Sequence, residues 1–258
     1  MHPLELAFES YGVEQQGKPL LILHGFFASS RNWRGVAKYL ATSRPVFVLD
    51  MRNHGVSGHR SHMDYPAMAG DILNFMDSRQ MAAVDILGHS MGGKVAMWFA
   101  LYYPLRVDKL IVADISPVSY QHSFATTIAA LKSLPLAALG NRKQAEQFLA
   151  DLIPDLNYRQ FLLQNLLYEN GHYRWRVNLD FFAENAANIV AFPQAAEKLV
   201  YARPALFLAG GDSFYIRPPA IYQCFPQAVI KEIAGASHWL HVDEPERFCR
   251  LVGEWLAE

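Results

Sequence analysis

The sequence has few cysteines, almost no net charge and no long uninterrupted hydrophobic run. Among its 258 residues there are only two cysteines, Cys224 and Cys249, and their spacing matches no metal-binding or redox motif. Both have apolar neighbours, so we expect them to be small core residues and neither a disulfide nor a nucleophile. A reducing cytoplasm is the expected compartment.

The balance of charge excludes several classes of partner. Lys and Arg together number 23 and Asp and Glu 24, which leaves a net charge of −1. Such a balance gives no electrostatic reason to expect binding to nucleic acid or to an anionic membrane. No apolar stretch reaches the roughly 18 residues of a membrane span. The first residues, Met1–Leu6, lack the basic and apolar regions of a signal peptide.

Hydrophobic residues make up 52% of the chain and charged residues 18%, which is typical of a globular protein with a large core. Short apolar runs alternate with helical patterns, and this alternation predicts an α/β fold with a mostly parallel sheet and helices on both faces. The predicted strands are Leu20–Leu23, Val46–Leu49, Val84–Leu87, Leu110–Ala113, Ala205–Ala209 and Val229–Ile233.

The alternation stops between residues 117 and 201. Helical patterns replace it over Phe124–Leu139, Arg142–Leu152 and Tyr158–Leu167, with a weaker pair after Trp175. An all-helical stretch between two strands of one sheet indicates a cap, or lid, over the strand ends. We therefore divide the chain into a core of residues 1–116 and 202–258 and a helical cap of residues 117–201.

The C-terminal helix has a recognisable start. Asp243 is followed three residues later by Glu246, with Pro245 between them, and this resembles a capping box. The preceding residues, Gly235–His238, are then expected to form a loop after the last strand.

A single pentapeptide carries the strongest functional signal. Gly88-His89-Ser90-Met91-Gly92 is a G-x-S-x-G motif that follows a predicted strand and precedes a helix-forming stretch. In this context the serine is expected to occupy a sharp, strained turn that exposes its hydroxyl as a nucleophile. The alternative is a passive serine in a glycine-rich turn.

A serine nucleophile needs a base, and the chain has ten histidines. His238 is the predicted base because it lies in a loop after the final strand, downstream of the serine and of an acid. His89 belongs to the same turn as Ser90, and the geometry of this turn should point the His89 side chain away from the serine hydroxyl. His24 and His54 adjoin glycines in turns and are expected to be structural, whereas His241 is a candidate pocket residue.

Several motifs, taken together and in this order, resemble the signature set of α/β-hydrolases: His24-Gly25-Phe26, Asp50–Ser57, Gly88–Gly93 and Gly235–Trp239. Two further stretches, Val112–Val118 and Trp175–Leu179, resemble the YbfF-type bacterial esterases and their mitochondrial relatives. The resemblance implies an α/β-hydrolase fold with the cap inserted after the strand that follows the nucleophile helix. It also implies hydrolysis of small-molecule carboxylic esters, with acyl-CoA thioesters as a further class, and neither a metal nor an organic cofactor.

The acid of the triad has two candidates. The common hydrolase pattern places it three residues after the glycine that closes the penultimate strand, and counting from Gly210 gives Ser213 at that position, with Asp212 one residue early. Asp114 instead ends the strand that follows the nucleophile helix, where YbfF-type relatives carry the acid. We predict Asp114, with Asp212 as the alternative acid. The competing role for Asp114 is that of a turn cap.

The remaining site residues follow from the same motifs. The backbone N–H groups of Phe26 and Met91 are expected to form the oxyanion hole. Phe27, Trp239 and His241 are the candidate substrate-pocket residues, although aromatic residues beside turns are as often core anchors.

The predicted activity is that of a serine esterase or thioesterase that works through an acyl-enzyme on Ser90. A carbon–carbon bond hydrolase or a lyase uses the same triad, because the triad does not encode the bond that is broken. A binding protein that kept only the fold should lack the nucleophile or the base, and both are present. Neither the oligomeric state nor the identity of the acyl group follows from the sequence.

Overall fold

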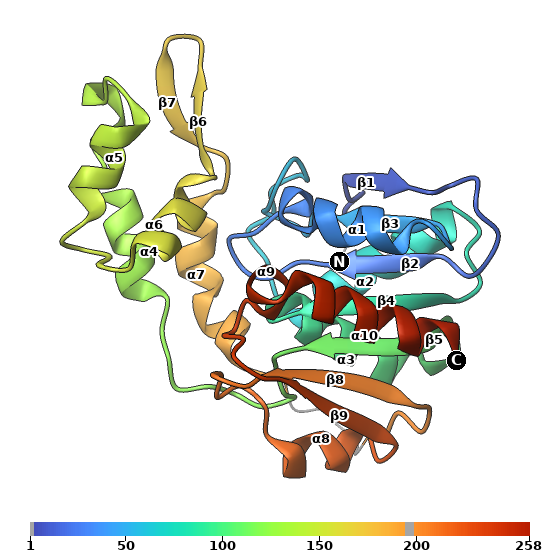
Figure 1. Ribbon diagram of the computed structural model, residues 1–258. Helices are drawn as coiled ribbons and strands as arrows, with labels where there is room; N and C mark the ends of the chain where they lie inside the picture. Colours follow the sequence, from blue (N-terminus) through green and yellow to red (C-terminus); the bar gives the residue numbers. More distant parts are fainter. Residues whose placement is uncertain (1–2, 194–198) are drawn as a thin grey trace.

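A seven-stranded sheet forms the centre of the molecule. The computed structural model describes residues 3–193 and 199–258, and the strand order of the main sheet is β1-β3-β2-β4-β5-β8-β9 (Figure 1). β1 pairs antiparallel with β3, and the other neighbouring strands are parallel, which confirms the predicted mostly parallel sheet. The strands are β1 (Phe8–Tyr11), β2 (Leu20–Leu23), β3 (Val46–Leu49), β4 (Val84–His89), β5 (Val107–Ala113), β8 (Ala205–Gly210) and β9 (Ala228–Ile233).

The sequence predicts six of these seven strands and misses β1. The inner strands are continuous apolar runs because a parallel sheet is covered on both faces, and all four residues of β2 are buried. β1 lies at the edge of the sheet and alternates between exposed and half-buried residues. Its short sequence, Phe-Glu-Ser-Tyr, contains no apolar run, so hydrophobicity alone does not reveal it.

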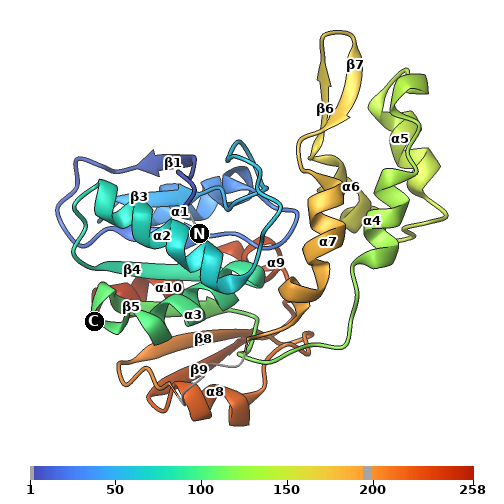
Figure 2. The ribbon, with the colours of Figure 1, turned by 180° about the vertical axis from the view of Figure 1, so that it is seen from behind.

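Helices cover both faces of the sheet, and alternate strand residues face opposite sides. Figure 1 shows α1 (Arg34–Leu40) and α10 (Pro245–Ala257) in front of the sheet, whereas α2 (Tyr65–Ser78) and α3 (Met91–Tyr102) cover the face seen in Figure 2. The first pair of helices packs on Leu20, Ile22, Val46, Val48, Leu206 and Leu208. The second pair packs on Leu21, Leu23, Leu49, Ile86, Val112 and Phe207. None of the helices in the described part of the chain is long and apolar enough to cross a membrane.

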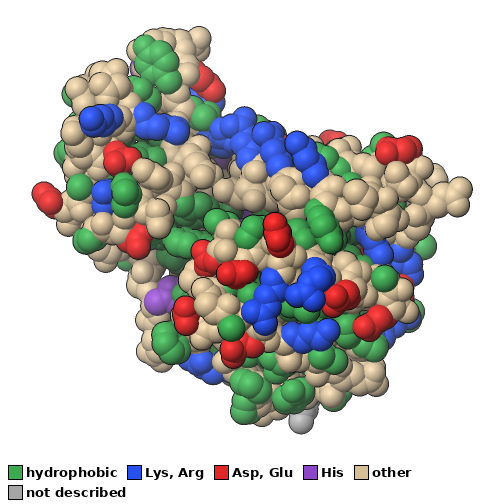
Figure 3. Space-filling view, in the orientation of Figure 1, with side chains coloured by type: hydrophobic (Ala, Val, Ile, Leu, Met, Phe, Trp, Pro, Cys, Tyr) green, Lys and Arg blue, Asp and Glu red, His purple; other side chains and the backbone are tan. Residues whose placement is uncertain are grey.

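The segment between β5 and β8 forms a separate lobe beside the sheet domain (Figures 1 and 2). Lys and Arg side chains gather along the junction between this lobe and the sheet domain (Figure 3). The elements of the lobe are α4 (Ala125–Lys132), the short 3-10 helix η3 (Leu136–Ala138), α5 (Arg142–Leu149), α6 (Leu156–Leu163), β6 (Leu166–Glu169), β7 (His172–Trp175) and α7 (Leu179–Val190).

The prediction that this region is all-helical is wrong, because β6 and β7 form an antiparallel hairpin. Asn170 and Gly171 make the turn, with φ of 51° and 84°. Positive φ at both central residues is what the type I′ hairpin turn requires, and Asn-Gly is a sequence that favours it. The helix predicted over Tyr158–Leu167 therefore ends early, and β6 begins at Leu166.

Another helix prediction in the lobe is also corrected. The helix predicted over Phe124–Leu139 ends at Lys132, because Pro135 disfavours helical backbone at the residue before it and only the short η3 follows. Of the pair of helices predicted after Trp175, the described residues contain α7. Residues 194–198, where part of a second helix would fall, lie outside the described residues.

The predicted capping box at Asp243 is also wrong. A short helix, α9 (Leu240–Asp243), precedes α10, and Glu244 occupies the cap position of α10. The Asp243 carboxylate instead accepts a hydrogen bond from the Ser237 backbone N–H at 2.8 Å. The loop predicted at Gly235–His238 is confirmed, because it lies between β9 and α9.

The cysteines lie where their apolar neighbours suggest. Cys249 is buried in α10, within the hydrophobic cluster on the front face of the sheet. Cys224 is half-buried at the end of α8 (Pro218–Cys224) and packs against the other cluster. Both thus contribute to the core.

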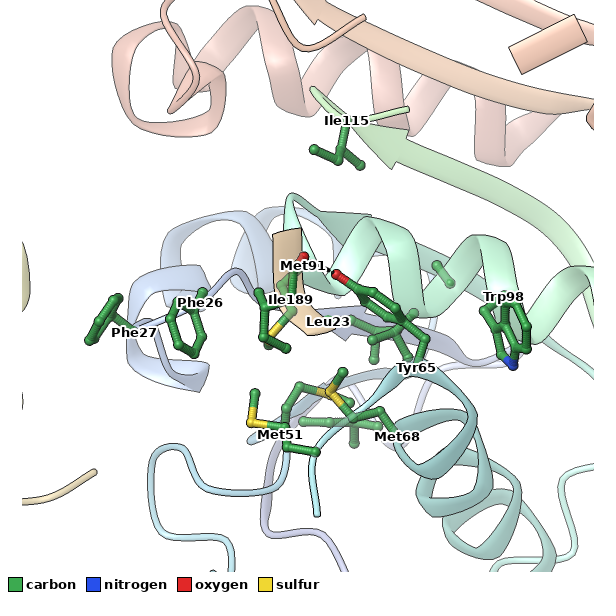
Figure 4. Close-up of a cluster of buried hydrophobic side chains, with 14 of the residues drawn as sticks. Leu23, Phe26, Phe27, Met51, Tyr65, Met68, Met91, Trp98, Ile115 and Ile189 are labelled. Carbon is green, nitrogen blue, oxygen red and sulfur yellow. Dashed lines mark hydrogen bonds between the residues drawn. The ribbon is translucent and has the colours of Figure 1, made fainter. Parts of the chain in front are cut away.

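Side chains from α2, α3 and α7 meet in the hydrophobic cluster drawn in Figure 4. Leu23 at the end of β2, Tyr65 on α2 and Met91 on α3 are buried there, next to Ile189 from α7. The Tyr65 hydroxyl donates a hydrogen bond to the Ile189 carbonyl at 2.5 Å. The end of α7 is therefore fixed on the sheet domain.

A buried ion pair fixes the loop that follows β3. Arg52 and Asp71 are both buried, and the guanidinium contacts both carboxylate oxygens, at 2.7 Å each. Asp71 also accepts the Leu4 backbone N–H at 2.6 Å, and Arg52 donates to the His62 carbonyl at 2.7 Å. The pair thus joins the N-terminal segment, this loop and α2.

Replacing Arg52 with Met should lower the free energy of unfolding by about 3–5 kcal/mol, because the buried Asp71 carboxylate loses its counter-charge. Urea unfolding followed by circular dichroism measures the change. Lys132→Met is the matched control. Its ion pair with Asp180 is largely exposed, so its loss should cost less than about 1 kcal/mol. Equal effects of the two substitutions would contradict a structural role for the buried pair.

Candidate active site

Ser90 lies in a tight turn between β4 and α3. Its backbone has φ 51° and ψ −118°, a strained conformation for a residue other than glycine. A Cβ on Gly88 would lie 2.3 Å from the Gly92 carbonyl oxygen, and a Cβ on Gly92 would lie 2.2 Å from the Leu23 carbonyl oxygen. Both positions therefore exclude any side chain, as the nucleophile-elbow interpretation requires.

His238 lies in the loop between β9 and α9, and its ring bridges two predicted site residues. Its Nε2 is 3.0 Å from Ser90 Oγ, and its Nδ1 is 2.7 Å from Asp114 Oδ2. The three predicted residues therefore form one hydrogen-bonded chain although they are far apart in the sequence.

Asp114 follows β5 with φ 51° and is fully buried. Its Oδ1 accepts a hydrogen bond from the Gly210 backbone N–H at 3.0 Å, and its Oδ2 accepts one from the Ser213 hydroxyl as well as from His238. Asp212, the alternative acid, is exposed, and among the described residues its side chain has no hydrogen-bond partner. Ser213, at the position where the common hydrolase pattern has its acid, instead binds Asp114.

His89, which the sequence interpretation sets aside, contacts the backbone of the candidate base. Its ring is buried, and its Nε2 lies 2.8 Å from the His238 carbonyl oxygen, so Nε2–H donates to it. Burial lowers the pKa of His89 well below its usual value, as does the neighbouring His238. A neutral His89 thus links the Ser90 turn to the His238 loop.

The candidate oxyanion donors come from two loops. Phe26 follows β2, and Met91 is the first residue of α3. Within residues 3–193 and 199–258, the backbone N–H groups of both residues have no protein acceptor. The next residue, Phe27, has φ 63°, and its N–H donates to His54 Nε2 at 3.2 Å. This contact holds the loop that carries Phe26.

His24 and His54 are buried in the loops beneath the site, as expected of structural histidines. His24 Nε2 accepts the Met51 N–H at 3.1 Å, and His54 Nδ1 donates to the Arg52 carbonyl at 2.9 Å. Burial lowers the pKa of both rings, so both are neutral. Neutral rings can accept the backbone hydrogen bonds that shape these loops.

A cavity of about 640 Å³ opens at Ser90 and His238, between the sheet domain and the lobe. The three candidate pocket residues, Phe27, Trp239 and His241, all lie in its wall. The Trp239 ring lies 5.8 Å from the Phe161 ring of α6, so both parts of the molecule form the wall. Further aromatic lining residues, which the sequence did not identify, are Tyr120, His122, Phe124, Tyr158 and Tyr215.

His241 is a neutral wall residue. Its ring stacks on Trp33 with centroids 4.1 Å apart and planes at 9°. Burial lowers its pKa to about 3. It therefore cannot compete with His238 as a base near neutral pH.

Lys94, one helical turn after Ser90, is a cavity residue that the sequence interpretation overlooks. It is buried, and its Nζ donates to the carbonyls of Val190, the last residue of α7, and of Ala191, at 2.8 Å each. The ammonium also lies 4.7 Å from the centre of the Tyr120 ring. Burial lowers the Lys94 pKa to about 7. No local pattern separates this lysine from an exposed helix residue, because its partners are 96 and 97 residues away.

Comparisons with known proteins show the family of the chain. The family model of the alpha/beta hydrolase fold matches residues 18–245. The chain is 39% identical to an sn-1-specific diacylglycerol lipase, ABHD11, of Xenopus tropicalis over 260 residues, which cover 96% of this chain and 81% of that protein. It is 33% identical to Esterase YbfF of Escherichia coli (strain K12) over 251 residues, 95% of each chain. A solved structure described as a marine microorganism esterase superposes with a TM-score of 0.93 at 40% identity, covering 98% of this chain and 99% of that one.

The buried lysine gives a pH-dependent stability. Because the Lys94 pKa is lowered in the folded protein, the unfolded chain binds more protons between pH 7 and pH 10, and stability contributed by this group rises with pH. Relative to Lys94→Met, the wild-type protein should gain about 2–4 kcal/mol in unfolding free energy from pH 7 to pH 9.5. Urea unfolding of both proteins at several pH values measures this difference. Parallel pH profiles would show that Lys94 has an ordinary pKa.

Proposed function

Because the chain belongs to the α/β-hydrolase fold family, we propose that it is a serine hydrolase that cleaves carboxylic esters through an acyl-enzyme on Ser90. The observation that carries the proposal is the hydrogen-bonded chain from Ser90 Oγ through the His238 ring to the buried Asp114 carboxylate. Ser90 and His238 line a cavity that is large enough for a small-molecule substrate. The relatives named as an esterase and a lipase support ester hydrolysis.

In this mechanism His238 Nε2 accepts the Ser90 proton as Oγ attacks the carbonyl carbon. The Asp114 carboxylate accepts the Nδ1–H hydrogen bond and stabilises the imidazolium that forms. The oxyanion accepts hydrogen bonds from the backbone N–H groups of Phe26 and Met91. His238 then returns the proton to the departing alcohol or thiol. Water, deprotonated by the same base, attacks the acyl-enzyme and releases the acid and free Ser90.

The acyl portion of the substrate is apolar. Aromatic side chains dominate the wall of the cavity, and apolar pockets with a few convergent polar groups favour apolar ligand segments. An acyl-CoA thioester reacts by the same steps with a thiol leaving group, so thioesters fall within the proposed chemistry.

Residues 117–201 act as a cap over this site. The ring of Trp239, next to the candidate base, packs against Tyr158 and Phe161 of α6 at centroid distances of 6.1 and 5.8 Å. Asn32 Nδ2 donates to Gln164 Oε1 at 2.8 Å and joins the sheet domain to the cap. These contacts hold the cap against the sheet domain beside the cavity.

A fluorophosphonate probe should label Ser90, because it reacts with an activated serine hydroxyl. Labelling and hydrolysis of p-nitrophenyl butyrate should both be lost in Ser90→Ala and kept in the exposed control Ser78→Ala. Mass spectrometry of the labelled peptide identifies the site. Labelling of another residue would refute the assignment.

The same assay addresses the alternative chemistries. A protein that reacts with the probe at Ser90, yet turns over no p-nitrophenyl ester or acyl-CoA of any chain length, would be assigned to the carbon–carbon hydrolases or lyases instead. Lack of both labelling and turnover would indicate a binding protein without catalysis.

Replacing Asp114 with Asn should lower kcat by about 10³–10⁴-fold, because the His238 ring loses the charge that orients it and stabilises the imidazolium. The matched control, Asp212→Asn, should stay within about twofold of wild type because its side chain is exposed. Steady-state kinetics with p-nitrophenyl butyrate compares the two variants, and circular dichroism checks their folding. A larger loss in Asp212→Asn would reverse the assignment of the acid.

A further inference from the structure

A second, smaller cavity adjoins the catalytic one. Its volume is about 240 Å³, and three of its wall residues, Phe27, Asn32 and Gln164, also line the catalytic cavity. Asn32 and Gln164 are hydrogen-bonded to each other, so their side chains form a shared partition. The two cavities are therefore neighbours on opposite sides of this pair of side chains.

Three arginines from different elements line the second cavity. Arg31 lies on the 3-10 helix η1 (Ser30–Trp33), Arg142 is the first residue of α5, and Arg176 follows β7. Arg31 thus belongs to the sheet domain, and the other two belong to the cap. Figure 3 shows Lys and Arg side chains gathered along the junction of these two parts. No Asp or Glu is among the described residues of this cavity wall.

These arginines lack the carboxylate partners that most other arginines of the chain have. Within the described residues, the Arg31 side chain makes no hydrogen bond or ion pair, and Arg142 donates only to the Leu166 carbonyl, at 2.5 Å. Arg176 Nε is buried without a hydrogen-bond partner. By contrast Arg174, two residues earlier, forms an ion pair with Glu169 at 2.6 Å. An unpaired buried N–H indicates a missing acceptor.

The positive charges of the cluster act on one another. Burial and the positive charges of Arg31 and Arg174 lower the pKa of Arg176, whereas the carboxylates of Asp50 and Glu169 raise it. The Asp50 oxygens form hydrogen bonds to the backbone N–H groups of Ser30 at 2.7 Å and Val56 at 2.9 Å and not to these arginines. In a chain of net charge −1 this cluster is a local feature and not a consequence of overall basicity.

We infer that the cavity lined by Arg31, Arg142 and Arg176 binds a phosphate group on the alcohol or thiol portion of the substrate. Guanidinium groups offer paired N–H donors that match phosphate oxygens, and several of them compensate its two negative charges. The apolar acyl chain then occupies the aromatic cavity, and the phosphate lies beyond the Asn32–Gln164 partition. This inference rests on the proposed function, because it describes the leaving-group side of the same reaction.

The experiment compares substrates that differ only in phosphate. One pair is 1-octanoylglycerol 3-phosphate and 1-octanoylglycerol, and the other is octanoyl-CoA and S-octanoyl-N-acetylcysteamine. In the wild-type protein, kcat/KM should favour the phosphorylated member of at least one pair by tenfold or more, mostly through KM. Equal kcat/KM values within both pairs would overturn the inference.

Arginine variants then locate the effect. Arg31→Gln and Arg176→Gln should each reduce kcat/KM for the preferred phosphorylated substrate by about tenfold, the usual effect of losing one charge-assisted contact. Both should leave its phosphate-free partner within twofold. Arg31→Gln is the variant least able to disturb folding, because its side chain is exposed and unpaired. The matched control, Arg174→Gln, should change neither substrate. Equal losses on both members of a pair would overturn the assignment.

Two further measurements separate the sources of phosphate. Calorimetric titration of Ser90→Ala with inorganic phosphate tests for a free-anion site, and co-sedimentation with phosphatidylglycerol vesicles tests for a lipid-surface site. Arginine-dependent binding of either probe, without a preference for phosphorylated substrates, would overturn the leaving-group role. Hydrolysis of p-nitrophenyl butyrate serves as the independent check on the proposed function. If that activity is present while the phosphate preference is absent, only the phosphate inference fails.

Discussion

The geometry of the site depends on the hydrogen bonds that the buried Asp114 carboxylate accepts. It receives hydrogen bonds from the Gly210 backbone, the Ser213 hydroxyl and the His238 ring, and its own backbone N–H donates to Leu208. The loops after β5, β8 and β9 therefore meet at one carboxylate. Parallel strands end at the same edge of a sheet, so this convergence follows from the topology. His238 is then held at hydrogen-bonding distance from Ser90, on the neighbouring strand end.

The parts of the fold that could be predicted are those with local signals. The inner strands are apolar runs, and the Ser90 turn needs glycines on both sides, so both could be read from neighbouring residues. β1 lies at the sheet edge and lacks such a run. The β6–β7 hairpin has a local signal in its Asn170-Gly171 turn, but the helical periodicity of the residues before it predicts a helix there. The convergence of Ser90, Asp114 and His238 could be anticipated from motif order, and the structure brings these residues together.

Other site features depend on contacts between segments that are distant in the sequence, so no pattern in the neighbouring residues predicts them. Lys94 has the sequence context of an ordinary helix residue, because the carbonyl that it contacts lies at the distant end of α7. His89 contacts His238 only because the Ser90 turn and the His238 loop meet in the fold. The arginine cavity likewise needs the sheet domain and the cap together. For Lys94, carbonyl groups of the cap accept the hydrogen bonds of a side chain from the sheet domain. The position of the cap thus affects both the Lys94 contacts and the shape of the arginine cavity.

The hydrogen bond between Ser213 and Asp114 has a consequence for the charge that the site can hold. The common hydrolase pattern places the acid at the position of Ser213, within hydrogen-bonding reach of the Asp114 oxygens. Two carboxylates this close cannot both be ionised, and they share a proton. An aspartate in place of Ser213 would therefore hold a proton in common with Asp114, and the pair would carry one negative charge and not two. The site has room for one charged acid, whichever of the two strands supplies it.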